Sequence, residues 1–157
     1  MKNSKKTIIK QATHYAKAPI IIALILTPVR YCLELLGLPE NAIFIIGLLW
    51  LTLGFAIYLG IKMALHKQAF KILLLSLLFY SPISRIPVAI LWWVDTKWEI
   101  GTHYGLYFDN FGQALLNHVI YGSLVQLIPG FLLGILTIAI MRHRKTLTKN
   151  KPAENGQ

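Results

Sequence analysis

Acidic residues are scarce in this chain, which has 6 aspartates and glutamates against 16 lysines and arginines among 157 residues. Charged residues of both signs make up only 14% of the sequence, whereas hydrophobic residues make up 55%. A soluble domain of this length carries about a quarter charged residues. The shortage of charge therefore argues against an ordinary soluble domain and predicts an integral membrane protein.

Cysteine and catalytic motifs are equally sparse. The single cysteine, Cys32, excludes an intrachain disulfide and a zinc site built from paired cysteines. The sequence also lacks a nucleophile elbow, an HExxH motif, a P-loop and a dinucleotide-binding fingerprint. We therefore assign no catalytic residue and no metal ligand, and we expect no cofactor.

The hydrophobic residues gather in four long runs. Each run is long enough to cross a hydrocarbon core of about 30 Å as an α-helix. We predict an all-α integral membrane protein with spans at about residues 18–38, 42–63, 70–93 and 115–141. Prolines are expected to kink three of these spans; they are Pro28, Pro82, Pro87 and Pro129. Residues 1–17 form a basic N-terminal segment, residues 94–114 an aromatic loop, and residues 142–157 a basic, disordered tail.

The basic residues lie where they can set the orientation of the spans. Residues 1–17 carry five lysines, residues 62–71 three, and residues 142–157 five lysines and arginines. Four spans place these segments on one side, and the positive-inside rule makes that side the cytoplasm. We expect a multi-pass protein of the cell (inner or plasma) membrane with both termini cytoplasmic. Charge segregated in this way also argues against nucleic acid as a partner.

Two arginines interrupt the apolar runs at matching depth. Arg30 and Arg85 each lie about eight residues before the outer end of their spans, or about 12 Å below the boundary. An arginine near the centre of a membrane helix costs at least roughly 2.5–3.5 kcal/mol. Glu34 follows Arg30 by one helical turn, and this spacing predicts an ion pair between them. Arg85 has no acidic residue in its own span.

Three kinds of group could meet the charge of Arg85. The loop at residues 94–114, which this topology places outside, could fold Asp95 or Asp109 inward. Alternatively, the backbone carbonyls freed by Pro82 and Pro87 could accept hydrogen bonds from the guanidinium. The third candidate is an anion from outside the chain, such as a lipid phosphate or a carboxylate. The sequence leaves these alternatives open.

Further polar residues lie at the level of the arginines and predict a pocket that opens outward. The candidate ligand-binding residues are Arg30, Glu34, Ser84, Arg85, His118 and Gln126. The outer loop adds Asp95, His103 and Asp109 as candidates. Asp95, Glu99 and His103 are spaced by four and would align a metal-binding face on a helix, but Gly101 and Gly105 oppose a continuous helix there.

Small residues suggest close helix packing at two places. Gly130 and Gly134 form a GxxxG pattern, and Ala56 and Gly60 are spaced in the same way. Such faces allow close approach of helices within one protomer or between two. The span at 42–63 carries few polar residues beyond Thr52, so we expect it to face lipid or a neighbouring subunit.

Three functional hypotheses follow. The first is binding or transport of an anionic or lipid-headgroup ligand in the outward pocket, by a protein whose partner is the lipid bilayer and which could form a homo-oligomer. The second is a non-catalytic subunit of a larger membrane complex, with the arginines paired to a partner's acidic residue. The third is a membrane enzyme acting on lipid head groups, with His103 or His118 as general acid or base.

Overall fold

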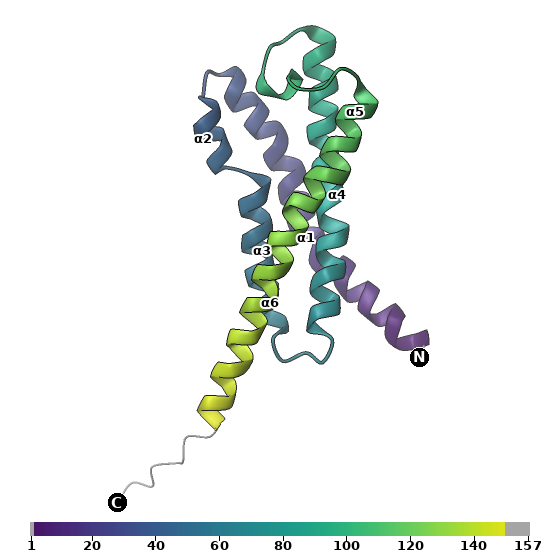
Figure 1. Ribbon diagram of the computed structural model, residues 1–157, viewed down its shortest axis with the longest axis vertical. Helices are drawn as coiled ribbons and strands as arrows, with labels where there is room; N and C mark the ends of the chain where they lie inside the picture. Colours follow the sequence, from purple (N-terminus) through teal and green to yellow (C-terminus); the bar gives the residue numbers. More distant parts are fainter. Residues whose placement is uncertain (1, 150–157) are drawn as a thin grey trace, which may run out of the picture.

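The computed structural model describes the backbone of residues 2–149 and the side chains of residues 6–147. In this range the chain is helical and contains no strand (Figure 1). Four stretches are long and apolar enough to span a membrane, at Lys6–Leu35, Glu40–Met63, Ala69–Trp98 and Phe111–Leu147. The predicted all-α fold with four such segments is confirmed.

The helices follow one another up and down through the molecule (Figure 1). The elements are α1 (Lys2–Leu35), α2 (Glu40–Ile45), α3 (Leu48–Met63), α4 (Ala69–Trp98), the 3₁₀ turn η1 (His103–Gly105), α5 (Phe111–Leu116), the π-helical turn η2 (Asn117–Tyr121) and α6 (Gly122–Lys149). We call the end that holds residues 36–39 and 99–110 the loop end. The terminal end holds residues 64–68, the start of α1 and the end of α6 (Figure 1).

Helix α4 is the centre of the bundle. It contacts α1, α3 and α6, while α1 packs mainly on α4, and α3 on α6. The buried side of α4 repeats every three or four residues, as expected for a helix packed along one face; it includes Leu73, Leu77, Tyr80, Ser81 and Ser84. The Tyr80 ring is fully buried, and its hydroxyl lies 3.3 Å from Thr52 Oγ1 on α3.

Small residues bring α3 and α6 together within one chain. A Cβ atom added at Gly60 would lie 2.7 Å from Thr137 Cβ and 3.0 Å from the carbonyl oxygen of Gly134. A Cβ atom at Gly134 would lie 2.6 Å from Leu73 Cδ2 on α4. The small-residue faces therefore serve packing inside the protomer. They also bury one side of α3. Its other side, with Trp50, Tyr58 and Ile61, is exposed, and the predicted contact with lipid or a neighbouring subunit remains a prediction for that side.

One predicted span is broken at a position that carries no proline. Helices α1, α4 and α6 run without a break through their prolines. The predicted span 42–63 is instead broken at Ile46 and Gly47, where the backbone leaves the helical conformation. A Cβ atom at Gly47 would lie 2.8 Å from the carbonyl oxygen of Phe44, so glycine permits this tight turn. A proline removes only one hydrogen bond of a helix, and flanking bonds can maintain it.

The helices extend into the basic segments at both ends of the chain. Helix α1 begins at Lys2 and includes the N-terminal segment. Helix α6 continues past the predicted end at 141 to Lys149, so the predicted disorder of the tail is wrong for residues 142–149, while residues 150–157 lie outside the described part. Arg142 explains part of this order. It donates from Nε to Ala64 O at 2.6 Å and from Nη2 to His66 O at 3.2 Å, and it stacks on Phe70.

Candidate functional site

A partly enclosed cavity of about 180 Å³ lies at the loop end of the bundle. Five segments line it: α1, α2, α4, the 99–110 loop and the π-helical turn η2. The lining residues are Arg30, Glu40, Ile43, Phe44, Arg85, Val88, His103, Tyr104 and His118. The structure thus brings Arg30, Arg85, His103 and His118, all predicted as site candidates, to a single pocket. We call it the arginine pocket.

Gln126 of α6 orients the guanidinium of Arg85 through hydrogen bonds. The Gln126 amide is oriented with its oxygen toward the guanidinium, because this oxygen then accepts from Arg85 Nε at 3.1 Å and from Nη2 at 3.2 Å. The amide nitrogen then lies 3.3 Å from Ser84 Oγ, and Ser84 donates its own proton to Ser81 O at 2.8 Å. Ser84 and Gln126, both predicted as ligand-binding, therefore orient Arg85 and do not line the pocket.

Gly122 makes room for this arrangement. A Cβ atom at Gly122 would lie 3.3 Å from Arg85 Cζ, so the guanidinium lies directly against the backbone of α6. The preceding π-helical turn adds an extra residue to the helix, a feature frequent at functional sites. The turn carries His118, which lines the pocket and packs edge-on against Phe108 with ring centroids 5.2 Å apart.

The predicted ion pair between Arg30 and Glu34 is wrong. Glu34 accepts a hydrogen bond from the backbone N–H of His103 at 2.7 Å, and its second oxygen contacts His103 Nδ1. The 3₁₀ turn at residues 103–105 directs the backbone N–H and the ring Nδ1 of His103 toward the Glu34 carboxylate. Arg30 is left 9% exposed, and its Nε has no hydrogen-bond partner within the protein.

Neither loop carboxylate reaches Arg85. Asp95 is buried and accepts from the N–H groups of Gly101 and Thr102, both at 3.0 Å, and from the Thr102 hydroxyl. It therefore closes the loop onto the end of α4. Asp109 is exposed, and its N–H donates to Gln113 Oε1 at 3.1 Å. Helix α4 ends at Glu99, whose backbone is in the left-handed conformation. Among the described residues, no group of three His, Cys, Asp or Glu side chains could hold a metal ion.

Three buried polar atoms that lack a partner within the protein belong to residues lining the arginine pocket. They are Arg30 Nε, the Tyr104 hydroxyl and His118 Nε2. Buried polar groups without a hydrogen bond are rare in folded proteins, so three around one cavity require an explanation. Burial raises the pKa of the Tyr104 phenol, so this hydroxyl remains protonated and able to donate at neutral pH. Sequence reasoning missed Tyr104, because nothing distinguishes it from the other aromatic residues of the loop.

The charges around the pocket do not cancel by direct pairing. Neither Arg30 nor Arg85 forms an ion pair with any acidic residue in the described part of the chain. Glu40 is the one acidic residue among those lining the pocket, and it is exposed. Since desolvated charges in proteins are normally paired, two guanidinium groups without an acidic partner, beside the unpaired Tyr104 hydroxyl and His118 Nε2, form a site suited to an anion.

Fold and site together define a helical bundle with four apolar segments of membrane-spanning length and a cationic pocket at its loop end. Comparison with known protein families, with curated proteins and with solved structures gives no match. A proposal for the function therefore rests on the chemistry of the pocket.

Proposed function

We propose that this chain is a multi-pass protein of the cell membrane whose arginine pocket opens outward and binds a small anion or a phosphate-bearing lipid headgroup. Four helices of sufficient length and apolarity support insertion into a membrane. Thirteen of the sixteen lysines and arginines fall in residues 1–17, 62–71 and 142–157. The described parts of these segments lie at the terminal end (Figure 1). Under the positive-inside rule the terminal end faces the cytoplasm.

The observation that carries this proposal is the convergence of unpaired donors on one cavity. Arg30 and Arg85 both line it without an acidic partner among the described residues. Arginine is the residue best suited to carboxylate and phosphate, because its planar group can donate two parallel hydrogen bonds. Each charge-assisted hydrogen bond contributes about 1.5–3 kcal/mol, and Tyr104 and His118 add uncharged donors.

The size of the pocket limits the ligand. A volume of about 180 Å³ is below the range of roughly 300–1,000 Å³ typical of pockets for drug-sized molecules. It corresponds to about six water molecules at roughly 30 Å³ each. A phosphate or carboxylate group fits this space, and the rest of a larger ligand would extend outside. Phe44 is 66% exposed and lines the pocket, so it offers an apolar contact for such an extension.

The side-chain packing between the arginine pocket and the terminal end favours binding of an anion over its transport through the bundle. Toward the terminal end, α4 continues with Ser81, Tyr80 and Leu77, all fully buried. The Tyr80 hydroxyl contacts Thr52 and links α4 to α3 across this layer. An anion that passed between the two ends would have to separate these side chains.

Thermal unfolding in a neutral detergent at constant ionic strength tests the proposal. Inorganic phosphate, acetate and glycerol 3-phosphate are titrated separately into the purified full-length protein. A ligand at one hundred times its Kd stabilises a protein by about 2.7 kcal/mol, so at least one anion should raise the Tm. Arg85→Gln should abolish the rise. Lys97→Gln, which removes an exposed cation near the same end but outside the pocket, should retain it.

Other outcomes separate the alternatives. If none of the three anions raises the Tm of the unmodified protein, binding of a small anion at this pocket is refuted. Release of a co-purifying membrane protein by Arg85→Gln would identify the chain as a subunit of a complex. Turnover of a lipid substrate that is lost in His118→Ala or His103→Ala, with binding retained, would identify an enzyme.

A further inference from the structure

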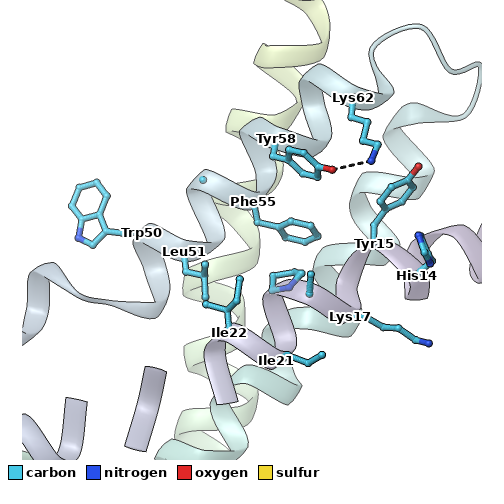
Figure 2. Close-up of a pocket in the computed structure, with 13 residues that line it drawn as sticks. His14, Tyr15, Lys17, Ile21, Ile22, Trp50, Leu51, Phe55, Tyr58 and Lys62 are labelled. Atoms are coloured by element: carbon cyan, nitrogen blue, oxygen red, sulfur yellow. Dashed lines mark hydrogen bonds between the residues drawn. The ribbon is translucent and has the colours of Figure 1, made fainter. Parts of the chain in front are cut away.

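A second and larger cavity, of about 730 Å³, lies between α1 and α3 (Figure 2). It shares no lining residue with the arginine pocket. Helix α1 packs mainly on α4 and makes few contacts with α3, which leaves this groove between α1 and α3. Its walls are chiefly apolar, with Ile21 and Ile22 on α1 facing Leu51 and Phe55 on α3 (Figure 2). We call it the α1–α3 groove.

One lysine is fixed at the terminal end of this groove. Lys62 Nζ donates to the hydroxyl of Tyr58 at 2.8 Å and lies 5.2 Å from the ring centroids of both Tyr58 and Tyr15 (Figure 2). An ammonium group has three N–H donors, so two remain for a ligand. His14 and Lys17 also belong to the lining, although Lys17 extends away from Lys62 (Figure 2). None of the thirteen described residues that line the groove is acidic.

The length of the groove matches one leaflet of a bilayer. Its lining on α3 runs from Trp50 to Lys62, twelve residues apart. At 1.5 Å per residue this is about 18 Å. One half of a hydrocarbon core measures about 15 Å. An acyl chain lying along Leu51 and Phe55 would therefore place its headgroup beside Lys62.

We propose that the α1–α3 groove binds an anionic phospholipid of the leaflet at the terminal end. The acyl chain lies against the apolar walls, and the phosphate accepts hydrogen bonds from Lys62, with the hydroxyls of Tyr58 and Tyr15 beside it. The cation at one end, the apolar walls and the lack of acidic residues in the lining match an anionic lipid. This site requires the membrane insertion proposed above but does not depend on the arginine pocket.

Gly54 offers a way to fill the groove without disturbing the fold. It lines the groove on α3, and a Cβ atom added there would have no neighbour within 4 Å. Gly54→Leu therefore adds a side chain to open space. Leucine is also a better helix former than glycine, so the variant should fold.

Native mass spectrometry of the full-length protein tests the proposal. The protein is released from mixed micelles that contain phosphatidylglycerol and phosphatidylcholine with identical acyl chains. The unmodified protein should retain phosphatidylglycerol in preference. Lys62→Gln should reduce this preference roughly tenfold, as expected for the loss of one charge-assisted hydrogen bond. Gly54→Leu should reduce retention of both lipids.

Lys71→Gln is the matched control, because it removes an exposed lysine near the same end that does not line the groove. An equal effect of Lys62→Gln and Lys71→Gln would mean diffuse attraction by surface charge and would overturn the proposal. Unchanged lipid retention in Gly54→Leu would do the same. Dissociation of a dimer by Gly54→Leu would show that a second copy of the chain occupies the groove.

These experiments test the arginine pocket and the α1–α3 groove independently. Arg85→Gln should keep the preference for phosphatidylglycerol, since Arg85 lies outside the α1–α3 groove. Lys62→Gln should keep the rise in Tm with small anions, since Lys62 lies outside the arginine pocket.

Discussion

Glu34 of α1 contacts the 99–110 loop beside the arginine pocket and anchors it there. Its carboxylate accepts from the backbone of His103 and contacts the imidazole, so one side chain of α1 fixes the 3₁₀ turn that carries Tyr104. Tyr104 in turn packs edge-on against Tyr31 of α1, with ring centroids 5.5 Å apart. The wall of the pocket formed by the loop therefore depends on a carboxylate that does not itself line the pocket.

Glu34→Gln should loosen this wall. An amide cannot accept from both the N–H and the ring of His103 as a carboxylate does, and the weakened contacts should cost about 1–3 kcal/mol. Hydrogen exchange should accelerate in residues 99–110 more than in α4. Glu99→Gln, which alters an exposed carboxylate of the same loop, should leave the exchange unchanged. Equal exchange in both variants and the unmodified protein would show that Glu34 does not anchor the loop.

The sequence located several pocket residues but not their partners. Arg30 and Arg85 could be placed at one level because helical rise converts residue count into depth. Glu34 could not be assigned, because its partner His103 is 69 residues away and reaches it through a loop. Spacing along one helix suggested Arg30 instead, and local spacing carries no information about such a distant contact.

At the scale of the elements, the close approach of α3 and α6 depends on glycine. Gly60→Val should destabilise the bundle by about 1–3 kcal/mol, because its branched side chain meets Thr137 and the backbone at Gly134. Gly54→Ala, on the same helix but in open space, should be neutral or gain up to about 1 kcal/mol. Thermal unfolding in detergent measures both. Equal Tm values would contradict the packing, and loss of a dimer in Gly60→Val would place Gly60 between protomers.

Helix number and approximate spans follow from the apolar runs, whereas the irregular turns do not. The break at Gly47 was not predicted, because glycine is common in membrane helices and usually leaves them intact. The π-helical turn at Asn117–Tyr121 carries no recognisable local signal, yet it supplies His118 to the pocket and precedes the Gly122 contact with Arg85. Both irregularities depend on contacts with other helices, and a single apolar run does not specify them.

At the scale of the whole molecule, the two ends differ in charge and in the site proposed for each. The loop end holds the arginine pocket and three exposed acidic residues, Glu40, Glu99 and Asp109. The terminal end holds the basic segments and the lysine of the α1–α3 groove. A molecule with both proposed sites would contact an anion on one side of the membrane and an anionic lipid on the other. The orientation of the bundle decides which of the two sites faces the cytoplasm.

Cysteine labelling tests that orientation. Cys32 is the only cysteine and is exposed, so Cys32→Ala gives a background without thiols and should fold. In this background Glu99→Cys, at the loop end, should react with a membrane-impermeant maleimide on intact cells. Lys67→Cys, in the turn at the terminal end, should react only after permeabilisation, because the positive-inside rule retains the basic segments in the cytoplasm. Thr146→Cys on α6 should behave like Lys67→Cys, since Thr146 and Lys67 line the same surface pocket. Labelling of Lys67→Cys and Thr146→Cys on intact cells, with Glu99→Cys protected, would reverse the orientation and place the arginine pocket in the cytoplasm. Opposite behaviour of Lys67→Cys and Thr146→Cys would instead mean that only one of α4 and α6 crosses the membrane, and the labelling of Glu99→Cys would show which.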